Sequence, residues 1–198
     1  MFERFTTSAR QVVKGAVKYA DGMGAGAGGG TGSGTVGEAE LLLALLDRAG
    51  TPAADVLAAL GAAGRRAAIE RDLAAVRRRG GISAEDAKAL AGLGIDVEEV
   101  VARVERVHGP GALAEPAETA RRRGRPLRRP FAREAKSVLE RSLRISLGRG
   151  DKYIGDEHLL LALTARPGVA AHVLADHGVT YVQALFSRSY GEVTSSSA

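Results

Sequence analysis

The chain has 198 residues, of which 45% are hydrophobic and 26% are charged, and its formal net charge is +5. This balance predicts a folded protein of one or two compact units, because a disordered chain of this length would lack the apolar surface that offsets ordering entropy. The absence of cysteine excludes disulfides, thiolate zinc sites, iron–sulfur clusters and a cysteine nucleophile.

The first predicted helix follows Phe5, where apolar residues recur at a spacing that describes one helical face. A glycine-rich stretch, 24–34, then predicts a flexible loop, since such composition is typical of linkers. A second, short helix begins after Gly37 with an acidic first turn, and a third helix ends at Gly61 before a fourth helical stretch. The face of the first helix consists of Phe5, Ala9, Val12, Val13, Ala16 and Ala20, and its candidate caps are Thr6, Thr7 and Ser8.

Two more helices are predicted in the middle of the chain, from Ser83 to Leu93 and from Val97 to Val107. A glycine-containing turn separates them, and the sequence Gly109-Pro110-Gly111 breaks the helical pattern after the second one. A basic segment that contains proline, Arg121–Pro130, follows and has the composition of a linker.

The blocks of the first unit recur in the same order after this linker. Phe131 opens a helix like the one after Phe5, and Ile154–Leu163 aligns with Val36–Leu45. One such unit cannot cover its own apolar stripes, so we predict that two tandem units pack together with pseudo-twofold symmetry. Because the chain shows no strand pattern, we predict an all-α fold of two four-helix repeats with extra helices between them.

The repeats suggest a division of the chain into four parts. The first repeat covers residues 1–79 and includes the glycine-rich loop, and residues 80–130 form a helical insertion with the basic linker. The second repeat covers residues 131–190, and residues 191–198 form a polar tail that we predict to be disordered.

Neither membrane association nor catalysis is expected. The longest aliphatic run, Leu41–Leu46, is far shorter than the roughly 20 residues of a membrane span, and Met1–Arg10 is too charged for a signal peptide. The chain has no phosphate-binding loop motif, no G-x-S-x-G motif and no histidine spacing typical of a metal site. We therefore expect a cytoplasmic protein that is not an enzyme and that holds no cofactor or metal.

Positive charge is concentrated in three clusters, Arg65–Arg66, Arg77–Arg79 and Arg121–Arg129. Such clusters are usually solvated helix faces or linkers, although they can also contact nucleic acid. Only 4% of the residues are aromatic, which leaves few rings for stacking on bases. Nucleic acid is therefore not the expected partner, and a basic regulatory protein that binds nucleic acid stays as an alternative.

The opening residues Met1–Thr6 and the string Tyr153–Leu163 resemble the amino-terminal double repeat of Clp unfoldases, the ClpC type in particular. The resemblance covers about residues 1–61 and 131–190, and residues 82–111 resemble an insertion of stand-alone Clp-repeat proteins of actinobacteria. It implies an all-helical module that docks adaptors and substrates for rings that feed the ClpP protease. Since we identify no ring motif, we expect a free-standing binding protein that unfolds nothing itself.

The resemblance implies two ligand sites. The first binds cyclic peptide antibiotics of the cyclomarin kind, because two phenyl rings supply apolar contact area and flanking charges orient peptide amides. The alternative is structural, with Phe131 stapling its helix and Phe2 filling the interface between the repeats. The matching residues of this first site are Phe2, Arg10, Phe131, Lys136 and Glu140.

The second site of the family recognises phosphoarginine with a threonine at the start of each long helix and the glutamate of a Gly-Thr-Glu-His string. Thr6 and Glu157 match, but the first unit has Ala39 at the glutamate position and the second has Ala132 at the threonine position. A carboxylate is needed for the guanidinium and a hydroxyl or amide for the phosphate, so each unit lacks one partner. Glu157 can equally serve as a first-turn acid that complements the helix dipole.

The sequence thus predicts a non-enzymatic peptide- and protein-binding module of the Clp protease system. Its expected ligands are cyclic peptides, peptides or Clp partner proteins, which it would sequester from ClpC. The alternative within the same system is an adaptor that delivers substrates to ClpC–ClpP.

Overall fold

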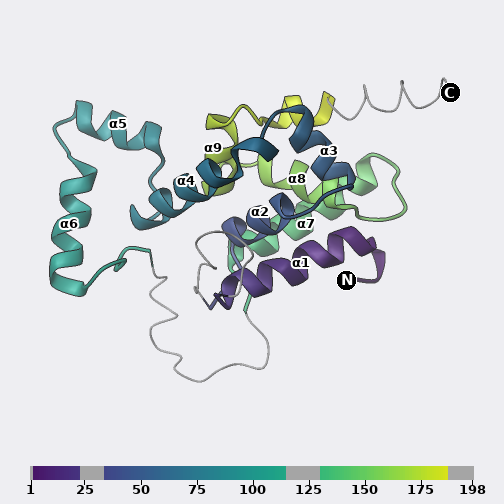
Figure 1. Cartoon of the computed structure of the whole chain (residues 1–198), viewed down its shortest axis with the longest axis horizontal. Coiled ribbons are helices and arrows are strands. Elements are labelled where there is room, and N and C mark those ends of the chain that lie inside the picture. The colour runs from purple at the N-terminus through teal and green to yellow at the C-terminus, as the bar shows by residue number, and fades with distance from the viewer. Residues whose placement is uncertain (1, 23–33, 115–129, 187–198) are drawn as a thin grey trace.

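The computed structural model describes residues 2–22, 34–114 and 130–186 (Figure 1). These residues form helices and contain no strand beyond two isolated β-bridges, which confirms the predicted all-α class. The Gly-rich loop apart from Gly34, the cluster Arg121–Arg129 and the tail 191–198 lie outside the described residues. No single described helix is long and apolar enough to span a membrane, although the helices Asp156–Thr164 and Val169–Asp176, bent by 90° relative to each other, meet both conditions jointly.

The helices follow the predicted order. The first repeat contains α1 (Thr7–Ala20), α2 (Glu38–Leu46), α3 (Pro52–Ala59) and α4 (Arg66–Arg78), with short 3-10 turns at Phe2–Arg4 and Ala63–Arg65. The middle of the chain forms α5 (Ala84–Gly92) and α6 (Val97–His108). The second repeat contains α7 (Arg133–Gly148), α8 (Asp156–Thr164) and α9 (Val169–Asp176), and residues 181–186 are also helical.

The two repeats share one hydrophobic core, with α2 and α8 at its centre. These two helices contact each other, and each also contacts both long helices, α1 and α7. Helices that are apolar on every side must be buried in this way. The leucines of α2, α8 and α9 that are less than 2% exposed are Leu41, Leu42, Leu45, Leu159, Leu160 and Leu174.

Two β-bridges cross between the repeats at the starts of the helices. At one bridge the Thr6 amide donates to the Ile154 carbonyl (2.9 Å), and the Ile154 amide donates to the Arg4 carbonyl (2.8 Å). At the other, the Ala132 amide donates to the Val36 carbonyl (2.9 Å), and Val36 donates to Pro130 (2.9 Å). Each long helix therefore starts beside the second helix of the opposite repeat. We call these places the α1–α8 junction (Thr6, Ser8, Asp156, Glu157 and His158) and the α2–α7 junction (Glu38, Ala39, Glu40, Ala132 and Glu134).

The middle helices α5 and α6 lie to one side of this core and project beyond the end of α4 (Figure 1). Val97 and Val101 of α6 are buried, but they are not part of the core that the repeats share. Two ion pairs tie α6 to the end of α4, since Arg78 binds both carboxylate oxygens of Glu105 (3.1 and 2.8 Å) and Arg79 lies 3.9 Å from Glu98. Both buried apolar residues of α6 and ion pairs to α4 therefore hold the middle helices in place.

Candidate functional site

The charged residues predicted to bind cyclic peptides are exposed on the two long helices. Arg10 lies on α1, and its Nε donates a hydrogen bond to the Phe5 carbonyl oxygen (3.0 Å). Lys136 and Glu140 lie on α7, and the side chain of Glu140 is 59% exposed. Among the described residues no hydrogen bond or ion pair joins Arg10 to either residue of α7. The structure therefore presents these groups to solvent without linking them into one site.

The two predicted phenyl rings differ in what the structure describes. Phe131 is half-buried and packs against the shared core beside its bridge partner Val36. Phe2 belongs to the short 3-10 turn at the start of the chain, and its side chain lies outside the described residues. Phe131 thus has at least the structural role that the sequence left open.

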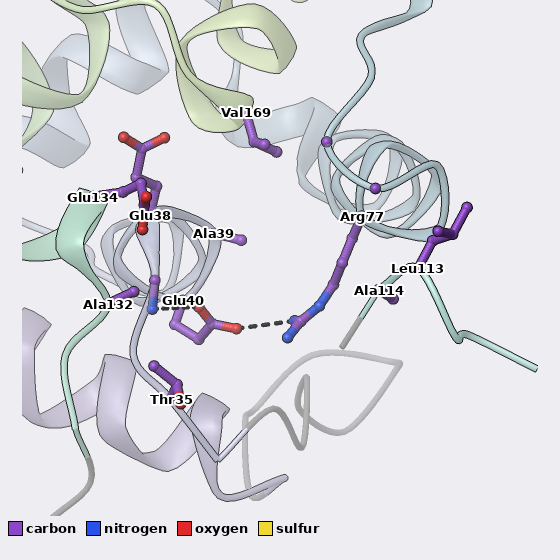
Figure 2. Close-up of a pocket in the computed structure, with 13 residues that line it drawn as sticks. Thr35, Glu38, Ala39, Glu40, Arg77, Leu113, Ala114, Ala132, Glu134 and Val169 are labelled. Atoms are coloured by element: carbon purple, nitrogen blue, oxygen red, sulfur yellow. Dashed lines mark hydrogen bonds and ion pairs between the residues drawn. The ribbon is translucent and has the colours of Figure 1, made fainter. Parts of the chain in front are cut away.

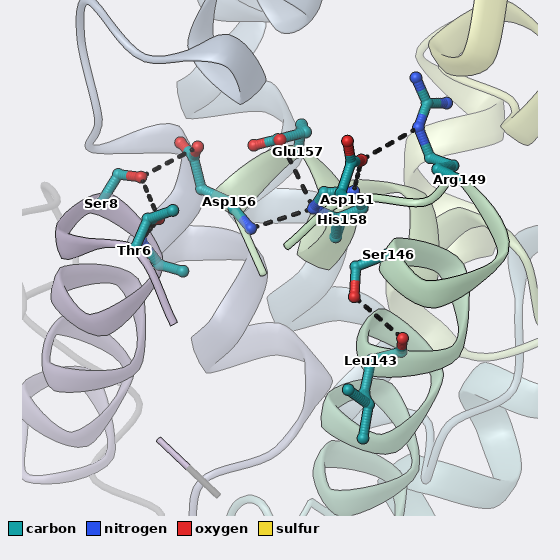
Figure 3. A network of polar contacts seen from close by, with 11 residues as sticks. Thr6, Ser8, Leu143, Ser146, Arg149, Asp151, Asp156, Glu157 and His158 are labelled. Carbon is teal, nitrogen blue, oxygen red and sulfur yellow. Dashed lines mark hydrogen bonds and ion pairs between the residues drawn. The ribbon is translucent and has the colours of Figure 1, made fainter. Parts of the chain in front are cut away.

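Hydroxyl and carboxylate groups fill the α1–α8 junction (Figure 3). Thr6 caps α1 by accepting a hydrogen bond from the Ala9 amide (3.2 Å), and its hydroxyl lies 2.9 Å from that of Ser8. Ser8 donates to Asp156 Oδ1 (3.3 Å), and Asp156 is fully buried. Its second oxygen, Oδ2, has no partner among the described residues.

The other two residues of this junction, Glu157 and His158, are buried as well. Glu157 is 8% exposed, and its carboxylate lies so close to Gly155 that a side chain at position 155 would displace it. His158 Nδ1 accepts a hydrogen bond from the Gly155 amide (3.0 Å), which requires an imidazole without a proton on Nδ1. Its Nε2 therefore donates to Asp151 Oδ2 (2.8 Å) from a neutral ring. The α1–α8 junction is closed, since its residues from α8 are almost inaccessible.

The residues at the positions of the predicted phosphoarginine site come together across the repeats and not within them. The bridges place Thr6 at the start of α8, where Glu157 lies, and place Ala132 at the start of α2, where Ala39 lies. Each unit by itself lacks one partner, but the junctions combine residues of both units. One junction contains both residue types of the family site, and the other contains neither.

The α2–α7 junction contains a cavity of about 350 Å³ (Figure 2). The starts of α2 and α7 form one side, and the end of α4 with the segment after α6 forms the other. Small residues stand where the opposite junction has Thr6 and Glu157, which leaves the space open. The lining consists of Thr35, Gly37, Glu38, Ala39, Glu40, Arg77, Gly80, Gly81, Leu113, Ala114, Ala132, Glu134 and Val169.

Acidic groups dominate this cavity. Glu40 is 3% exposed, accepts a hydrogen bond from the Gly37 amide (2.7 Å) and forms an ion pair with Arg77 (3.0 Å). Burial raises the pKa of Glu38, and the nearby carboxylate of Glu134 raises it further, while the Ala170 amide lowers it, as do Arg166 and His172. Figure 2 shows Glu38 and Glu134 beside each other, with Arg77 entering from the opposite wall.

Sequence reasoning missed this cavity and its charged residues Glu38, Arg77 and Glu134. The one signal was the pair of alanines, Ala39 and Ala132, at equivalent places of a site that otherwise has large polar residues. Among the described residues no group of three or more histidine, aspartate or glutamate side chains is placed to hold a metal ion.

Comparisons with known proteins identify the family of the chain. The chain is 30% identical over 197 residues to the chloroplastic chaperone ClpC2 of Oryza sativa subsp. japonica, and 31% identical over 179 residues to chloroplastic ClpC1 of Arabidopsis thaliana. These matches cover 98% and 90% of the chain but only 16% and 14% of the relatives, so the chain spans about a seventh of their length.

A solved structure has the same fold. It is the N-terminal domain of the Caseinolytic protease associated chaperone ClpD from Arabidopsis thaliana, with a TM-score of 0.52, 19% identity, and coverage of 95% of this chain and 94% of that one. The family model described as the Clp repeat (R) N-terminal domain matches residues 73–177, more than half of the chain. The chain therefore belongs to the Clp repeat N-terminal domain family.

Proposed function

We propose that this chain is a non-catalytic binding module of the Clp system in the cytoplasm. It binds cyclic peptides of the cyclomarin kind or Clp partner proteins and withholds them from ClpC. Family membership and the likeness of nearly the whole chain to the ClpC relatives support the coarse part of this proposal. The ligand and the sequestering role are the specific part.

The exposed charges of the two long helices carry the proposal of a ligand site. Arg10, Lys136 and Glu140 are all solvent-exposed, although they come from different repeats. Because its Nε is held by the Phe5 carbonyl, the guanidinium of Arg10 is already oriented before a ligand arrives. A pre-oriented polar group of this kind and a partly exposed phenyl ring, that of Phe131, are groups that can hold a peptide.

Calorimetry with a cyclomarin-type cyclic peptide tests this site. We expect Phe2→Ala and Lys136→Glu each to weaken binding about tenfold, since removal of one good contact costs about 1.4 kcal/mol. The matched control is Lys88→Glu, which makes the same charge change at an exposed position of α5. Absence of binding by the unmodified chain, or equal affinities of all variants, contradicts the proposal.

A reconstituted ClpC–ClpP pair separates sequestration from delivery. A sequestering protein leaves the degradation of substrates unchanged or lowers it. An adaptor instead accelerates the degradation of its substrates, and that result would contradict the sequestering role.

We propose that Thr6 and Glu157 serve the structure of the α1–α8 junction and do not bind phosphoarginine. The hydroxyl of Thr6 is engaged as a helix cap, and the carboxylate of Glu157 is buried against Gly155. We expect no saturable binding of phosphoarginine that is lost in Glu157→Gln, with calorimetry as the measurement. Binding that disappears in this variant would show that the junction opens for this ligand.

The ion pairs of the arginine cluster 77–79 count against the nucleic-acid alternative. Arg77, Arg78 and Arg79 are paired with Glu40, Glu105 and Glu98, respectively. Arginines neutralised by carboxylates release few counterions from a phosphate backbone. We expect unchanged mobility of duplex DNA at low salt, whereas an affinity that falls steeply with salt would revive the alternative.

A further inference from the structure

We propose that the cavity at the α2–α7 junction binds one positively charged side chain, an arginine or a lysine, of a partner peptide, with Glu38 and Glu134 as its carboxylate partners. The proposal does not depend on the cyclic-peptide site, whose residues do not line this cavity.

The space is of the right size and has a structural cause. About 350 Å³ lies within the range of about 300 to 1,000 Å³ that small-molecule sites occupy. It exists because Ala39 and Ala132 end at their Cβ atoms, where the closed junction has a glutamate and a threonine. The middle of the chain completes the wall through Gly80, Leu113 and Ala114.

The charge of the lining selects a cation. Within the described part of the lining, the carboxylates of Glu38, Glu40 and Glu134 face one guanidinium, that of Arg77, and Arg77 is already paired with Glu40. Arg166 and His172 act on Glu38 but do not line the cavity. A bound cation would relieve the repulsion between Glu38 and Glu134, whereas a phosphate group would add to it.

The apolar part of the lining selects a cation with a hydrocarbon stem. Val169, Leu113 and Ala114 provide carbon surface on the same cavity. The methylene groups of arginine and lysine pack on such surface while their charged ends reach polar partners. A bare metal ion would use neither this surface nor any suitable group of ligands among the described residues.

Calorimetry on the full chain with four capped amino acids tests the class of ligand. The probes are the N-acetyl methylamides of arginine, lysine, citrulline and phosphoarginine. We expect arginine or lysine to bind at least about tenfold more tightly than citrulline, which has nearly the shape of arginine without its charge. Equal binding of arginine and citrulline, or tighter binding of phosphoarginine than of arginine, overturns the proposal.

Two variants test whether the cationic probe binds in the cavity. Glu134→Gln removes one exposed carboxylate from the first turn of α7, and Ala39→Leu fills the cavity from α2. We expect each to weaken the binding of the cationic probe by about fivefold or more. Glu85→Gln is the matched control, since it removes the same charge from the first turn of α5 outside the cavity.

Circular dichroism verifies that each variant folds. Unchanged affinity in both cavity variants, or an equal loss in the control, contradicts the assignment. Lys136→Glu should keep the binding of the capped probe, because this change tests the proposed cyclic-peptide site. A failure of that site therefore leaves the cavity proposal unaffected.

Discussion

The two junctions have the same backbone hydrogen bonds but differ in the side chains that lie between their helices. Each joins a long helix of one repeat to the second helix of the other through a pair of crossing hydrogen bonds of 2.8 or 2.9 Å. In the α1–α8 junction, Thr6, Ser8, Asp156 and Glu157 fill the space between the helices, whereas the α2–α7 junction keeps a cavity of about 350 Å³. A duplicated fold can therefore keep its symmetry in the backbone while its two sites take different roles.

The third residue of the second helix repeats this contrast. Glu40 and His158 both accept a hydrogen bond from the amide of the glycine before the helix. His158 does so as a neutral ring whose other nitrogen binds Asp151, while Glu40 binds Arg77 from α4. The same backbone requirement is thus met once by a neutral group and once by an ion pair, and the residues of the ion pair line the cavity of the α2–α7 junction.

The largest expected effect is that of Arg77→Met on stability. Glu40 is almost fully buried, so loss of the guanidinium removes the Arg77–Glu40 ion pair and should cost about 2 to 3 kcal/mol of unfolding free energy. Urea denaturation measures this cost. The control is Arg71→Met on the same helix, where the exposed Arg71 side chain donates to the Ala67 carbonyl (3.4 Å) and pairs with no carboxylate of the described residues.

The same experiment at the closed junction sharpens the comparison. Asp151→Ala removes the acceptor of His158 Nε2, but water can replace it because Asp151 is 37% exposed. We expect a cost of about 1 kcal/mol. If Asp151→Ala costs as much as Arg77→Met, the contrast between a neutral and an ionic cap does not hold.

The repeats and most helix starts were predictable from the sequence. Thr6, Thr51 and Ser83 all cap helices through their hydroxyls, as their residue types before apolar periodic segments indicate. The crossing of the helix starts was not predictable in this way. It depends on how α2 packs against α8, and periodicity identifies the buried face of a helix but not the element that covers it.

The candidate site was therefore predicted in its residues but not in its pairing. The identities of Thr6, Ala39, Ala132 and Glu157 are visible in the sequence, and their assignment to one filled and one empty junction is not. Arg77 was counted as part of a basic cluster, because its carboxylate partner is 37 residues away and belongs to another helix. Long-range partners of this kind follow from the tertiary structure alone.

A smaller effect on stability, with the opposite sign, is expected for Glu38→Gln. Its carboxyl has a raised pKa in the folded protein because it is buried, so the folded state binds the proton more tightly than the unfolded state. The contribution of Glu38 to stability therefore falls as the pH rises from its ordinary pKa of 4.5 to its raised pKa in the folded state. The glutamine still offers an oxygen to the Ala170 amide, so the variant should gain about 0.5 kcal/mol at pH 7.

Denaturation curves at pH 7 and pH 4 check this sign. The gain of Glu38→Gln should shrink or vanish at the lower pH, where Glu38 in the unmodified protein takes up its proton. Glu85→Gln again serves as control and should show no such trend. A loss of stability at neutral pH would mean that the charge of Glu38 is favourable without a ligand, which weakens the case for an acidic cavity awaiting a cation.

The smallest effect on overall stability concerns the outer wall of the cavity. Hydrogen bonds from Arg78 and from the Gly111 amide lower the pKa of Glu105 from 4.5 to about 2. Because the pKa of Glu105 is lower in the folded state than in the unfolded state, this attachment of α6 contributes fully to stability above the unfolded-state pKa. The contribution is lost as the pH falls toward 2. Since α5 and α6 lie outside the shared core, Glu105→Gln should leave the unfolding midpoint of the repeats nearly unchanged. It should nevertheless increase amide hydrogen exchange at neutral pH in residues 97–114, whereas the closed α1–α8 junction, which the middle helices do not cover, should exchange as before.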